Sequence, residues 1–431
     1  MKRNTLLMLT ALAAGWAVET TQASTPVGTE GADTAQCLYP SVDKAGRPHR
    51  IPAIATAKNG HIFAISDYRP CGNDIGYGEV DIKCRISTDH GKTWTPEFTF
   101  ADGVGDNHGG EVWRTGFGDA AVVADAKRNE VLVMMVCGKT VCWHGNYIPG
   151  SKESNPNRVA RVRVTYNKKT KQWDWTQPVE VTEQIYSQFV DEQGQPTVQS
   201  LFIGSGRICQ SRQVKVGKYY RLYCAVWTKN QGNRVMYSDD FGENWYVLGT
   251  LAERPAPQGD EPKCEELPDG SVLLSSRKGY GRFFNIFKYT DVKKAEGKWG
   301  EVAASHDQEG GIRVGANSTN GEVMLVQARR NADGKKVPLL LQSLPAANNR
   351  AEVTIFYKPL ETAANYDTPQ HVAEKWEGSF RVTEKGSAYS TFCLQKDKKI
   401  GFFYEEEPGW YNIMYVPLSL ERITEGKYSV R

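Results

Sequence analysis

The stretch that decides the fold is STDHGKTW at residues 87–94, which recurs as SDDFGENW at residues 238–245. In each copy an Asp stands third, a Gly fifth and a Trp eighth. The Asp carboxylate can accept hydrogen bonds from backbone N–H groups of its own loop, while the Gly supplies the φ > 0 geometry of a tight turn. The Trp is then free to fill an apolar gap between neighbouring sheets. We interpret both copies as structural turns that do no chemistry themselves.

Around these turns one pattern repeats six times, namely an apolar strand, a short turn and a second apolar strand. Further strand-like segments follow, such as residues 159–166 and 352–357, and no long stretch has helical periodicity. The six turns fall at Asn59-Gly60, residues 127–129, Gly217, Asp269-Gly270, Asn320-Gly321 and residues 396–399. Six four-stranded units of roughly 65 residues predict an all-β fold, a six-bladed β-propeller. Long inserts such as residues 362–385 are expected to be loops.

The composition agrees with a β-rich chain and excludes some functions. Of the 431 residues, 41 are Gly and 11% are aromatic, which favours strands joined by many turns. The 53 basic and 50 acidic side chains nearly cancel, so the overall charge gives no indication of a nucleic-acid partner. We expect one propeller domain over residues 37–431, most simply as a monomer.

The first residues have the pattern of an export signal. Lys2 and Arg3 precede a mostly apolar stretch at residues 6–18, and Thr21-Gln22-Ala23 provides a small-residue cleavage site. The apolar stretch is shorter than the ~20 residues that a membrane span requires. We predict a signal peptide at residues 1–23, a flexible segment at residues 24–36, and a secreted or periplasmic mature protein without a membrane span.

The chain has nine cysteines, an odd number for an exported protein. Their spacings match no zinc pattern, so no metal site is expected. Two pairs, Cys137 with Cys142 and Cys209 with Cys224, could bridge adjacent strands. A set of buried apolar thiols explains the same spacings equally well.

One ordered set of residues carries a family resemblance. Arg50 lies in the tripeptide Arg-Ile-Pro near the start, and Arg277 ends the segment ELPDGSVLLSSR. Tyr389 lies in GSAYST, where a last blade would open. Together with the Asp-containing turns, this set resembles the bacterial sialidases (neuraminidases), which are glycoside hydrolases with a six-bladed propeller. The resemblance covers residues 40–425 and implies that no cofactor is needed.

The resemblance implies three arginines for the substrate carboxylate. Sialic acid carries a carboxylate on its anomeric carbon, and Arg provides permanently charged, bidentate donors for such a group. The matching positions are Arg50, Arg277 and Arg350, the last of which directly precedes a predicted strand. Arg329 and Arg330 are the alternatives to Arg350.

The same carboxylate accounts for the nucleophile that the resemblance implies. An attacking Asp or Glu would be repelled by it, whereas a neutral hydroxyl activated by a base would not, and sialidases are a known exception with a Tyr nucleophile. Tyr389 matches that tyrosine. Glu261, which lies sixteen residues before Arg277, resembles the glutamate that accepts the proton of the tyrosine.

A general acid must protonate the departing sugar oxygen from a loop that the aglycone can reach. Asp74, twenty-four residues after Arg50, lies where the family places this acid, and Asp67 and Asp81 are its rivals. Arg69 resembles a family residue that lines the sugar pocket. Glu405 resembles a carboxylate that orients Arg50.

These residues predict an exported exo-α-sialidase that releases terminal α-linked sialic acid from glycans, glycoproteins or glycolipids with retention. A trans-sialidase, including an intramolecular one, would use the same residues, so the sequence does not separate the two activities. A sialic-acid-binding propeller lectin would need the arginines but not Tyr389, Glu261 or Asp74. The presence of all three favours an enzyme.

Overall fold

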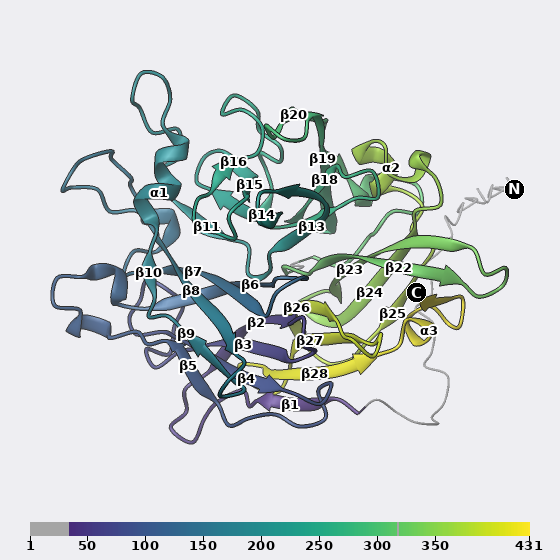
Figure 1. Cartoon of the computed structure of the whole chain (residues 1–431), viewed down its shortest axis with the longest axis horizontal. Coiled ribbons are helices and arrows are strands. Elements are labelled where there is room, and N and C mark those ends of the chain that lie inside the picture. The colour runs from purple at the N-terminus through teal and green to yellow at the C-terminus, as the bar shows by residue number, and fades with distance from the viewer. Residues whose placement is uncertain (1–33, 317–318) are drawn as a thin grey trace, which may run out of the picture.

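Six sheets are arranged around a central axis in the computed structural model, which describes residues 34–316 and 319–431 (Figure 1). Within these residues each sheet forms one blade, so the predicted all-β, six-bladed propeller is confirmed. The predicted signal peptide at residues 1–23 lies outside the described residues. Most of the predicted flexible segment does so too, although its last residue already begins a strand.

The first three blades follow the chain in order. Blade 1 contains β2 (His49–Thr56), β3 (Ile62–Tyr68), β4 (Asp81–Ser87) and β5 (Phe98–Ala101). Blade 2 contains β6 (Phe117–Ala124), β7 (Glu130–Cys137), β8 (Arg158–Asn167), β9 (Gln172–Trp175), β10 (Val179–Glu180) and β12 (Gly206–Arg207). Blade 3 contains β11 (Leu201–Ile203), β13 (Cys209–Val216), β14 (Tyr219–Thr228), β15 (Gly232–Ser238) and β16 (Tyr246–Val247).

The other three blades complete the ring. Blade 4 contains β17 (Asp260–Glu266), β18 (Val272–Lys278), β19 (Gly281–Asp291), β20 (Glu296–Trp299) and β21 (Ala303–Ala304). Blade 5 contains β22 (Val323–Arg330), β23 (Lys336–Ala347), β24 (Ala351–Pro359), β25 (Gly378–Arg381) and β29 (Tyr428–Val430). Blade 6 contains β26 (Ser387–Leu394), β27 (Ile400–Glu406), β28 (Asn412–Leu418) and β1 (Gln36–Tyr39).

Helical segments are short and lie in the connections. The α-helices of the described residues are α1 (Thr182–Tyr186), α2 (Pro369–Ala373) and α3 (Leu420–Ile423). The 3-10 turns are η1 (Gly105–Asn107), η2 (Val112–Arg114), η3 (Cys142–His144), η4 (Ser187–Phe189), η5 (Ser305–Asp307) and η6 (Ala363–Asn365). No helix within residues 34–316 and 319–431 is long and apolar enough to cross a membrane.

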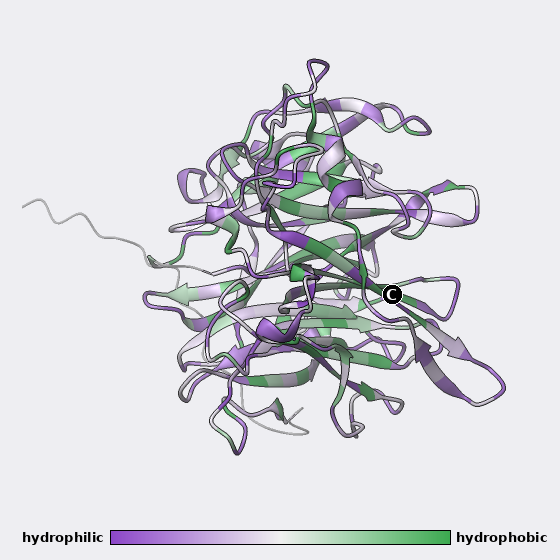
Figure 2. Cartoon of the chain, turned by 90° about the vertical axis from the view of Figure 1, so that its left-hand side faces the viewer, coloured by the Kyte–Doolittle hydropathy of each residue, from purple (hydrophilic) through white to green (hydrophobic). Residues whose placement is uncertain are grey.

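The core lies between the blades rather than at the centre of the ring. One cluster joins Phe63 of blade 1 to Val133 of blade 2, and comparable clusters join each later pair of neighbours. Another joins Tyr39 and Tyr415 of blade 6 to Ile54 of blade 1. Apolar residues gather in the sheets and hydrophilic ones in the loops (Figure 2). Because apolar burial is the main favourable term in folding, each blade is held by its two neighbours.

Two strands from the ends of the described chain complete blades that are built mostly from other segments. β1 pairs antiparallel with β28, so that Gln36 lies opposite Tyr415. β29 pairs with β22, and Ala328 lies opposite Val430. The ring is therefore closed by hydrogen bonds as well as by apolar packing.

The two Asp-containing turns have the structure that the sequence predicts. In the first, the Asp89 carboxylate accepts hydrogen bonds from the backbone N–H of Thr93 at 2.9 Å and from the Thr93 hydroxyl at 2.6 Å, and Gly91 has φ +81°. Asp240 makes the equivalent bonds to Asn244 in the second turn. Each turn follows the third strand of its blade. Trp245 is buried between blades 2 and 3, which confirms its structural role.

Two details of the predicted chain organisation are wrong. Asn320-Gly321 does not form a hairpin turn, because the hairpin of blade 5 turns at residues 331–335. Gly321 instead lies so close to the neighbouring backbone that an added Cβ would be 1.4 Å from the Ser343 carbonyl oxygen. Residues 362–385 are not only a loop, since they contain α2 and the outer strand β25. These elements complete blade 5 by pairing with β24.

The cysteines form no disulfide. All nine lie within the described residues, all have free thiols, and seven of them are buried. The structure thus favours the set of buried apolar thiols over the Cys137–Cys142 and Cys209–Cys224 bridges. Burial raises the pKa of these thiols, for example that of Cys142 to about 12, so they remain protonated and behave as small apolar side chains.

Candidate active site

A pocket of about 240 Å³ opens where the inner strands of several blades begin. It brings together four residues that the sequence singled out, namely Asp74, Glu261, Arg277 and Tyr389. The rest of its lining consists of Ile51, Ile75, Tyr77, Asp119, Val141, Cys142, Trp143, Asn157, Phe202, Ile203, Ser205, Asp260 and Asn320. A concave site with a few convergent polar groups is the usual form of a small-molecule site.

The residues that face this pocket lie at irregularities in the inner strands. The strand register shifts between Arg50 and Ala53 in β2, and between Gly118 and Ala121 in β6. Comparable shifts occur beside Glu261 in β17 and beside Tyr389 in β26. A bulge locally turns a strand and re-aims a side chain. Register shifts in four blades thus direct polar side chains toward one pocket.

Tyr389, Glu261 and Arg277 form a continuous chain of polar contacts. The Tyr389 hydroxyl donates a hydrogen bond to one oxygen of the Glu261 carboxylate. The other oxygen of that carboxylate accepts a hydrogen bond from Arg277 Nη1 at 2.9 Å. Burial raises the pKa of Tyr389 well above its ordinary value, and the Glu261 charge raises it further. The phenol therefore keeps its proton until a base removes it, and Glu261 is placed to do so.

Arg50 is held by a carboxylate from the other end of the chain. Its Nε donates to Glu405 at 2.8 Å and its Nη2 donates to the second Glu405 oxygen at 3.1 Å. Glu405 also accepts hydrogen bonds from the backbone N–H of Ile51 and of Tyr389. The guanidinium carbon of Arg50 lies 5.8 Å from the centroid of the Tyr389 ring. Burial lowers the pKa of Arg50, but the Glu405 charge more than offsets this, so its pKa is raised.

Asp74 lines the pocket from the loop between β3 and β4. Its side chain is 49% exposed and forms an ion pair with Arg69 Nη2 at 2.9 Å. Arg69 is buried and also contacts Asp67 at 3.2 Å, so one guanidinium links the two carboxylates. The loop is fixed against blade 2, because an added Cβ on Gly76 would lie 2.7 Å from the Val141 backbone nitrogen. Asp74 is thus both held in place and partly open to solvent.

The two rival acids are less accessible than Asp74. Asp67 is fully buried, and its carboxylate accepts a hydrogen bond from the backbone N–H of Asp119 at 3.0 Å. Asp81 is also buried, where it accepts from the Gly103 N–H and pairs with Lys83. Neither of them lines the pocket. Of the three carboxylates, only Asp74 lines the pocket.

Arg350 lies beside the same group of strands, although it does not line the pocket. Its carbonyl oxygen accepts a hydrogen bond from the Ser387 N–H at 2.7 Å, at the start of the strand that carries Tyr389. Its charge and that of Arg50 both act on Tyr411, whose ring centroid lies 5.2 Å from the Arg50 guanidinium carbon.

The alternatives to Arg350 lie elsewhere. Arg329 and Arg330 end β22, where they pair with Ser429 and Tyr428 of β29. The Arg330 guanidinium is engaged by Asp333 at 2.6 Å and by Glu361. Of these three arginines, Arg350 is the one whose backbone is hydrogen-bonded to the strand that carries Tyr389.

Sequence reasoning did not single out most other residues of the pocket, among them Asp119, Tyr77 and Trp143. Asp119 begins the inner part of β6 with φ +51°, a strained value for a residue that is not glycine. Burial raises the pKa of its carboxyl well above the ordinary value, and the charges of Asp74 and Asp67 raise it further. Tyr77 and Trp143 line the pocket while remaining 53% and 56% exposed. No local pattern distinguishes these residues from other strand and loop residues.

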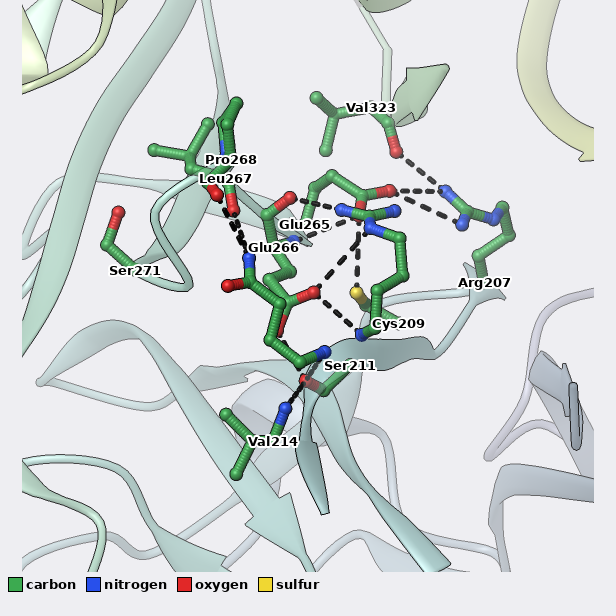
Figure 3. A network of polar contacts seen from close by, with 12 residues as sticks. Arg207, Cys209, Ser211, Val214, Glu265, Glu266, Leu267, Pro268, Ser271 and Val323 are labelled. Carbon is green, nitrogen blue, oxygen red and sulfur yellow. Dashed lines mark hydrogen bonds and ion pairs between the residues drawn. The ribbon is translucent and has the colours of Figure 1, made fainter. Parts of the chain in front are cut away.

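Buried charges continue along the central axis behind the pocket. Lys263, two residues after Glu261 on β17, lies 3.6 Å from the Glu322 carboxylate. Farther along the same strand, Glu265 contacts Arg207 at 3.3 Å, as Figure 3 shows. Buried charges are costly unless they are paired, and these are paired. Across residues 34–316 and 319–431, no group of three or more His, Cys, Asp or Glu side chains could hold a metal ion.

The fold and the pocket together define a sialidase-type propeller, and comparisons with known proteins agree. A curated sialidase of Bacteroides fragilis is 23% identical over 367 residues, covering 83% of this chain and 59% of that protein. A sialidase of Micromonospora viridifaciens is 26% identical over 395 residues, covering 90% and 54%. The chain therefore spans between half and three fifths of the length of these curated relatives. It is similar to these sialidases over most of its own length.

Solved structures show the same fold. The intramolecular trans-sialidase from Ruminococcus gnavus, solved in complex with oseltamivir carboxylate, superposes with a TM-score of 0.66 at 16% identity. The match covers 92% of this chain and 99% of that one. No family model matches the chain.

Proposed function

We propose that the protein is an exo-α-sialidase that acts through a tyrosyl-enzyme intermediate. The observation that carries this proposal is the hydrogen bond from the Tyr389 hydroxyl to the Glu261 carboxylate inside the pocket. Arg277 contacts that carboxylate, and Arg50 lies beside the Tyr389 ring. The proposed nucleophile lies next to its base, and two arginines lie near this pair. Such an arrangement suits a substrate that carries a carboxylate on its reacting carbon.

Substrate binding would use the arginines. The carboxylate of a terminal sialic acid would be held by Arg50, Arg277 and Arg350, which places the adjacent anomeric carbon near the Tyr389 oxygen. Glu405 keeps the Arg50 fork in one orientation before substrate arrives. A preorganised fork loses less side-chain entropy on binding than a mobile one.

The first chemical step would form a bond between the Tyr389 oxygen and the anomeric carbon while the bond to the aglycone breaks. Glu261 takes the phenolic proton, and Asp74 gives a proton to the departing oxygen. In the second step water attacks the same carbon, Asp74 accepts a proton from that water, and Glu261 returns a proton to Tyr389. Two displacements at one carbon give net retention.

Following the reaction of 3′-sialyllactose by proton NMR would test the proposal. We expect α-sialic acid as the first product, formed before it equilibrates with the β anomer, and at least a 100-fold slower reaction with the Tyr389→Phe variant, since nucleophile and base act as a unit. A folded protein that binds this substrate but leaves it uncleaved would be a lectin instead.

The same experiment separates hydrolysis from transfer. A trans-sialidase would pass the sialyl group to added lactose, and an intramolecular one would release an anhydro sugar in place of free sialic acid. We propose hydrolysis as the main outcome, with sialylated glycans, glycoproteins or glycolipids as substrates.

We also propose that the protein is exported and acts as a monomer, with residues 1–23 removed. The charge and apolarity pattern of residues 1–23 supports export. N-terminal sequencing of the protein secreted by an expressing cell would test it. A start at Ser24 is expected, and a start at Met1 would contradict the proposal.

A further inference from the structure

A second hollow, separate from the catalytic pocket, lies at the rim of the propeller between blades 1 and 2. It has a volume of about 530 Å³ and is lined by both aromatic and polar side chains. Its floor includes Phe100 of β5 and Trp175 of β9, and the loop between β5 and β6 forms one wall. The two strands lie side by side in Figure 1, and their aromatic rings are in contact. None of the residues proposed for catalysis lines this hollow.

The aromatic floor is rigid and partly open. The Trp175 ring packs against Phe98, with centroids 5.0 Å apart, and against Phe100, with centroids 5.5 Å apart. Nevertheless, Trp175 remains 41% exposed. The neighbouring Trp113 is anchored by an edge contact with Phe117 at 5.9 Å. An indole that is supported underneath and exposed above provides a flat apolar surface at low entropic cost.

The rim of the hollow provides both hydrogen-bond donors and hydrogen-bond acceptors, which are the partners that hydroxyl groups require. Asp102, Glu111, Arg114 and Gln177 line it and are exposed. Glu111 and Arg114 form an ion pair at 3.3 Å, which leaves one uncompensated negative charge, that of Asp102, among these four side chains. Such a rim repels an anion. It can both donate hydrogen bonds to and accept them from an uncharged polyol.

The wall of the hollow is held at its base. The Val104 N–H donates to the Arg114 carbonyl, and the Gly105 N–H donates to the Thr115 carbonyl, both at 3.0 Å. These bonds close the loop that carries Glu111. The backbone that carries Glu111 and Arg114 is therefore closed before any ligand arrives, which lowers the entropic cost of binding.

The hollow also lies toward the catalytic face. Ala101, the last residue of β5, pairs with Ile82, which in turn pairs with Asp67. Asp67 contacts Arg69, the residue that holds the proposed acid Asp74. The end of β5 and the acid cluster are thus at the same edge of blade 1.

From this geometry we propose that the rim hollow is a non-catalytic binding site for neutral hexose units of a glycan. A sugar ring presents an apolar C–H face that would stack on Trp175, while its hydroxyl groups would bond to Gln177, Asp102 and the Glu111–Arg114 pair. The charge of Asp102 makes the rim less favourable for a sialic acid than for a neutral sugar. The site would hold the uncharged part of a branched glycan while another branch enters the catalytic pocket.

Saturation-transfer NMR with the full-length protein and the neutral sugars lactose, N-acetyllactosamine and mannotriose would test this proposal. A saturating dehydro-sialic acid inhibitor is added to occupy the catalytic pocket. We expect at least one of these sugars to bind, with an affinity reduced ~10-fold or more by Trp175→Ala, on the scale of a lost aromatic contact. The matched control is Trp410→Ala, because Trp410 is 47% exposed but does not line the hollow.

Two further measurements make the outcome decisive. Gln177→Ala removes a rim group without disturbing the aromatic packing and should also weaken binding, even if Trp175→Ala unfolds. Hydrolysis of a small methylumbelliferyl sialoside should be unchanged in Gln177→Ala, because that substrate has no neutral sugar. Absence of binding by all three sugars, or equal binding by wild type, Trp175→Ala and Gln177→Ala, would overturn the proposal. Neither result depends on whether the protein is a sialidase.

Discussion

Glu405 holds Arg50 across 355 residues of sequence, with Nε and Nη2 of the guanidinium at 2.8 Å and 3.1 Å from its two carboxylate oxygens. The Glu405 side chain is fully buried and also accepts two backbone N–H groups, one beside Arg50 and one of Tyr389. One carboxylate therefore fixes a proposed substrate-binding cation and the strand of the proposed nucleophile together.

Replacing that carboxylate should weaken the proposed substrate carboxylate site without removing it. In Glu405→Gln the amide keeps one acceptor for Arg50 but loses the charge, so we expect kcat/KM to fall ~10-fold or more, mainly through KM. Steady-state kinetics with a methylumbelliferyl sialoside measure this. Glu406→Gln is the matched control, because the neighbouring Glu406 contacts Lys385 and Tyr404 rather than Arg50. Equal losses in both variants would point to a general loss of stability.

Tyr389 should carry a covalent label after reaction with a 3-fluorosialosyl fluoride. The fluorine slows breakdown of the intermediate, so the sugar should remain on the nucleophile long enough for peptide mass spectrometry. We expect the modified peptide to contain Tyr389, and we expect no label in Tyr389→Phe. A label on another side chain, for example on Glu261, would assign the nucleophile to that residue instead.

The importance of Asp74 should depend on the leaving group. For Asp74→Ala, hydrolysis of sialyllactose should fall by several orders of magnitude, while a sialoside of an acidic phenol should lose much less, because that phenol departs without protonation. The measurement is the ratio of the two kcat/KM values within the variant. Similar losses on both substrates would reject Asp74 as the acid, and Asp67 and Asp81 would then be tested in the same way.

Arg350 and Arg330 make a matched pair for the third cation. Arg350→Lys keeps the charge but loses the fork, so we expect kcat/KM to fall ~10-fold or more. Arg330→Lys should leave it near the wild-type value, because Arg330 is engaged by Asp333 and Glu361 at the end of β22. The reverse pattern of kinetics would contradict the assignment of Arg350.

Asp67 should give stability a characteristic pH dependence. Burial raises its pKa to about 7, against about 3.9 in an unfolded chain. Between these values the folded state binds more protons than the unfolded state, so the free energy of unfolding falls as pH rises through this window. Asp67→Asn cannot lose a proton there. We expect its Tm relative to wild type to increase from about pH 5 to about pH 8.

Thermal melts across that range provide the measurement, with Asp102→Asn as the control for an exposed carboxylate. A Tm difference for Asp67→Asn that stays constant with pH would contradict the assignment. Such a result would mean that Asp67 is ionised throughout, held in that state by Arg69.

The fold could be predicted from sequence because its signals are local. Each Asp-containing turn needs only eight consecutive residues, and five of the six predicted hairpin turns are found. The sixth predicted turn, at Asn320-Gly321, is wrong. An Asn-Gly pair indicates a hairpin only when the glycine is not needed for close packing against another part of the chain. Here the Ser343 carbonyl oxygen lies so close to Gly321 that no side chain fits.

The site was only partly predictable, because its geometry depends on strand irregularities. Arg50, Glu261 and Tyr389 were recognised from family resemblance, but strand alternation alone would not indicate which side chains point to the pocket once a bulge shifts the register. Asp119 shows what sequence analysis could not predict. Its position depends on a φ of +51° and on a hydrogen bond from its N–H to Asp67, which lies 52 residues earlier.

The pairing of β1 with β28 gives the site a mechanical dependence on the ring. Arg50 lies on β2 of blade 1, whereas Glu405 and Tyr389 lie in blade 6, so the seam between these two blades runs through the proposed catalytic group. Leu38 and Tyr39 of β1 share a core cluster with Ile54 of blade 1, so a pulling force that peels residues 36–39 from the sheet would remove part of the packing across this seam. The proposed activity would then fall when the chain is under tension.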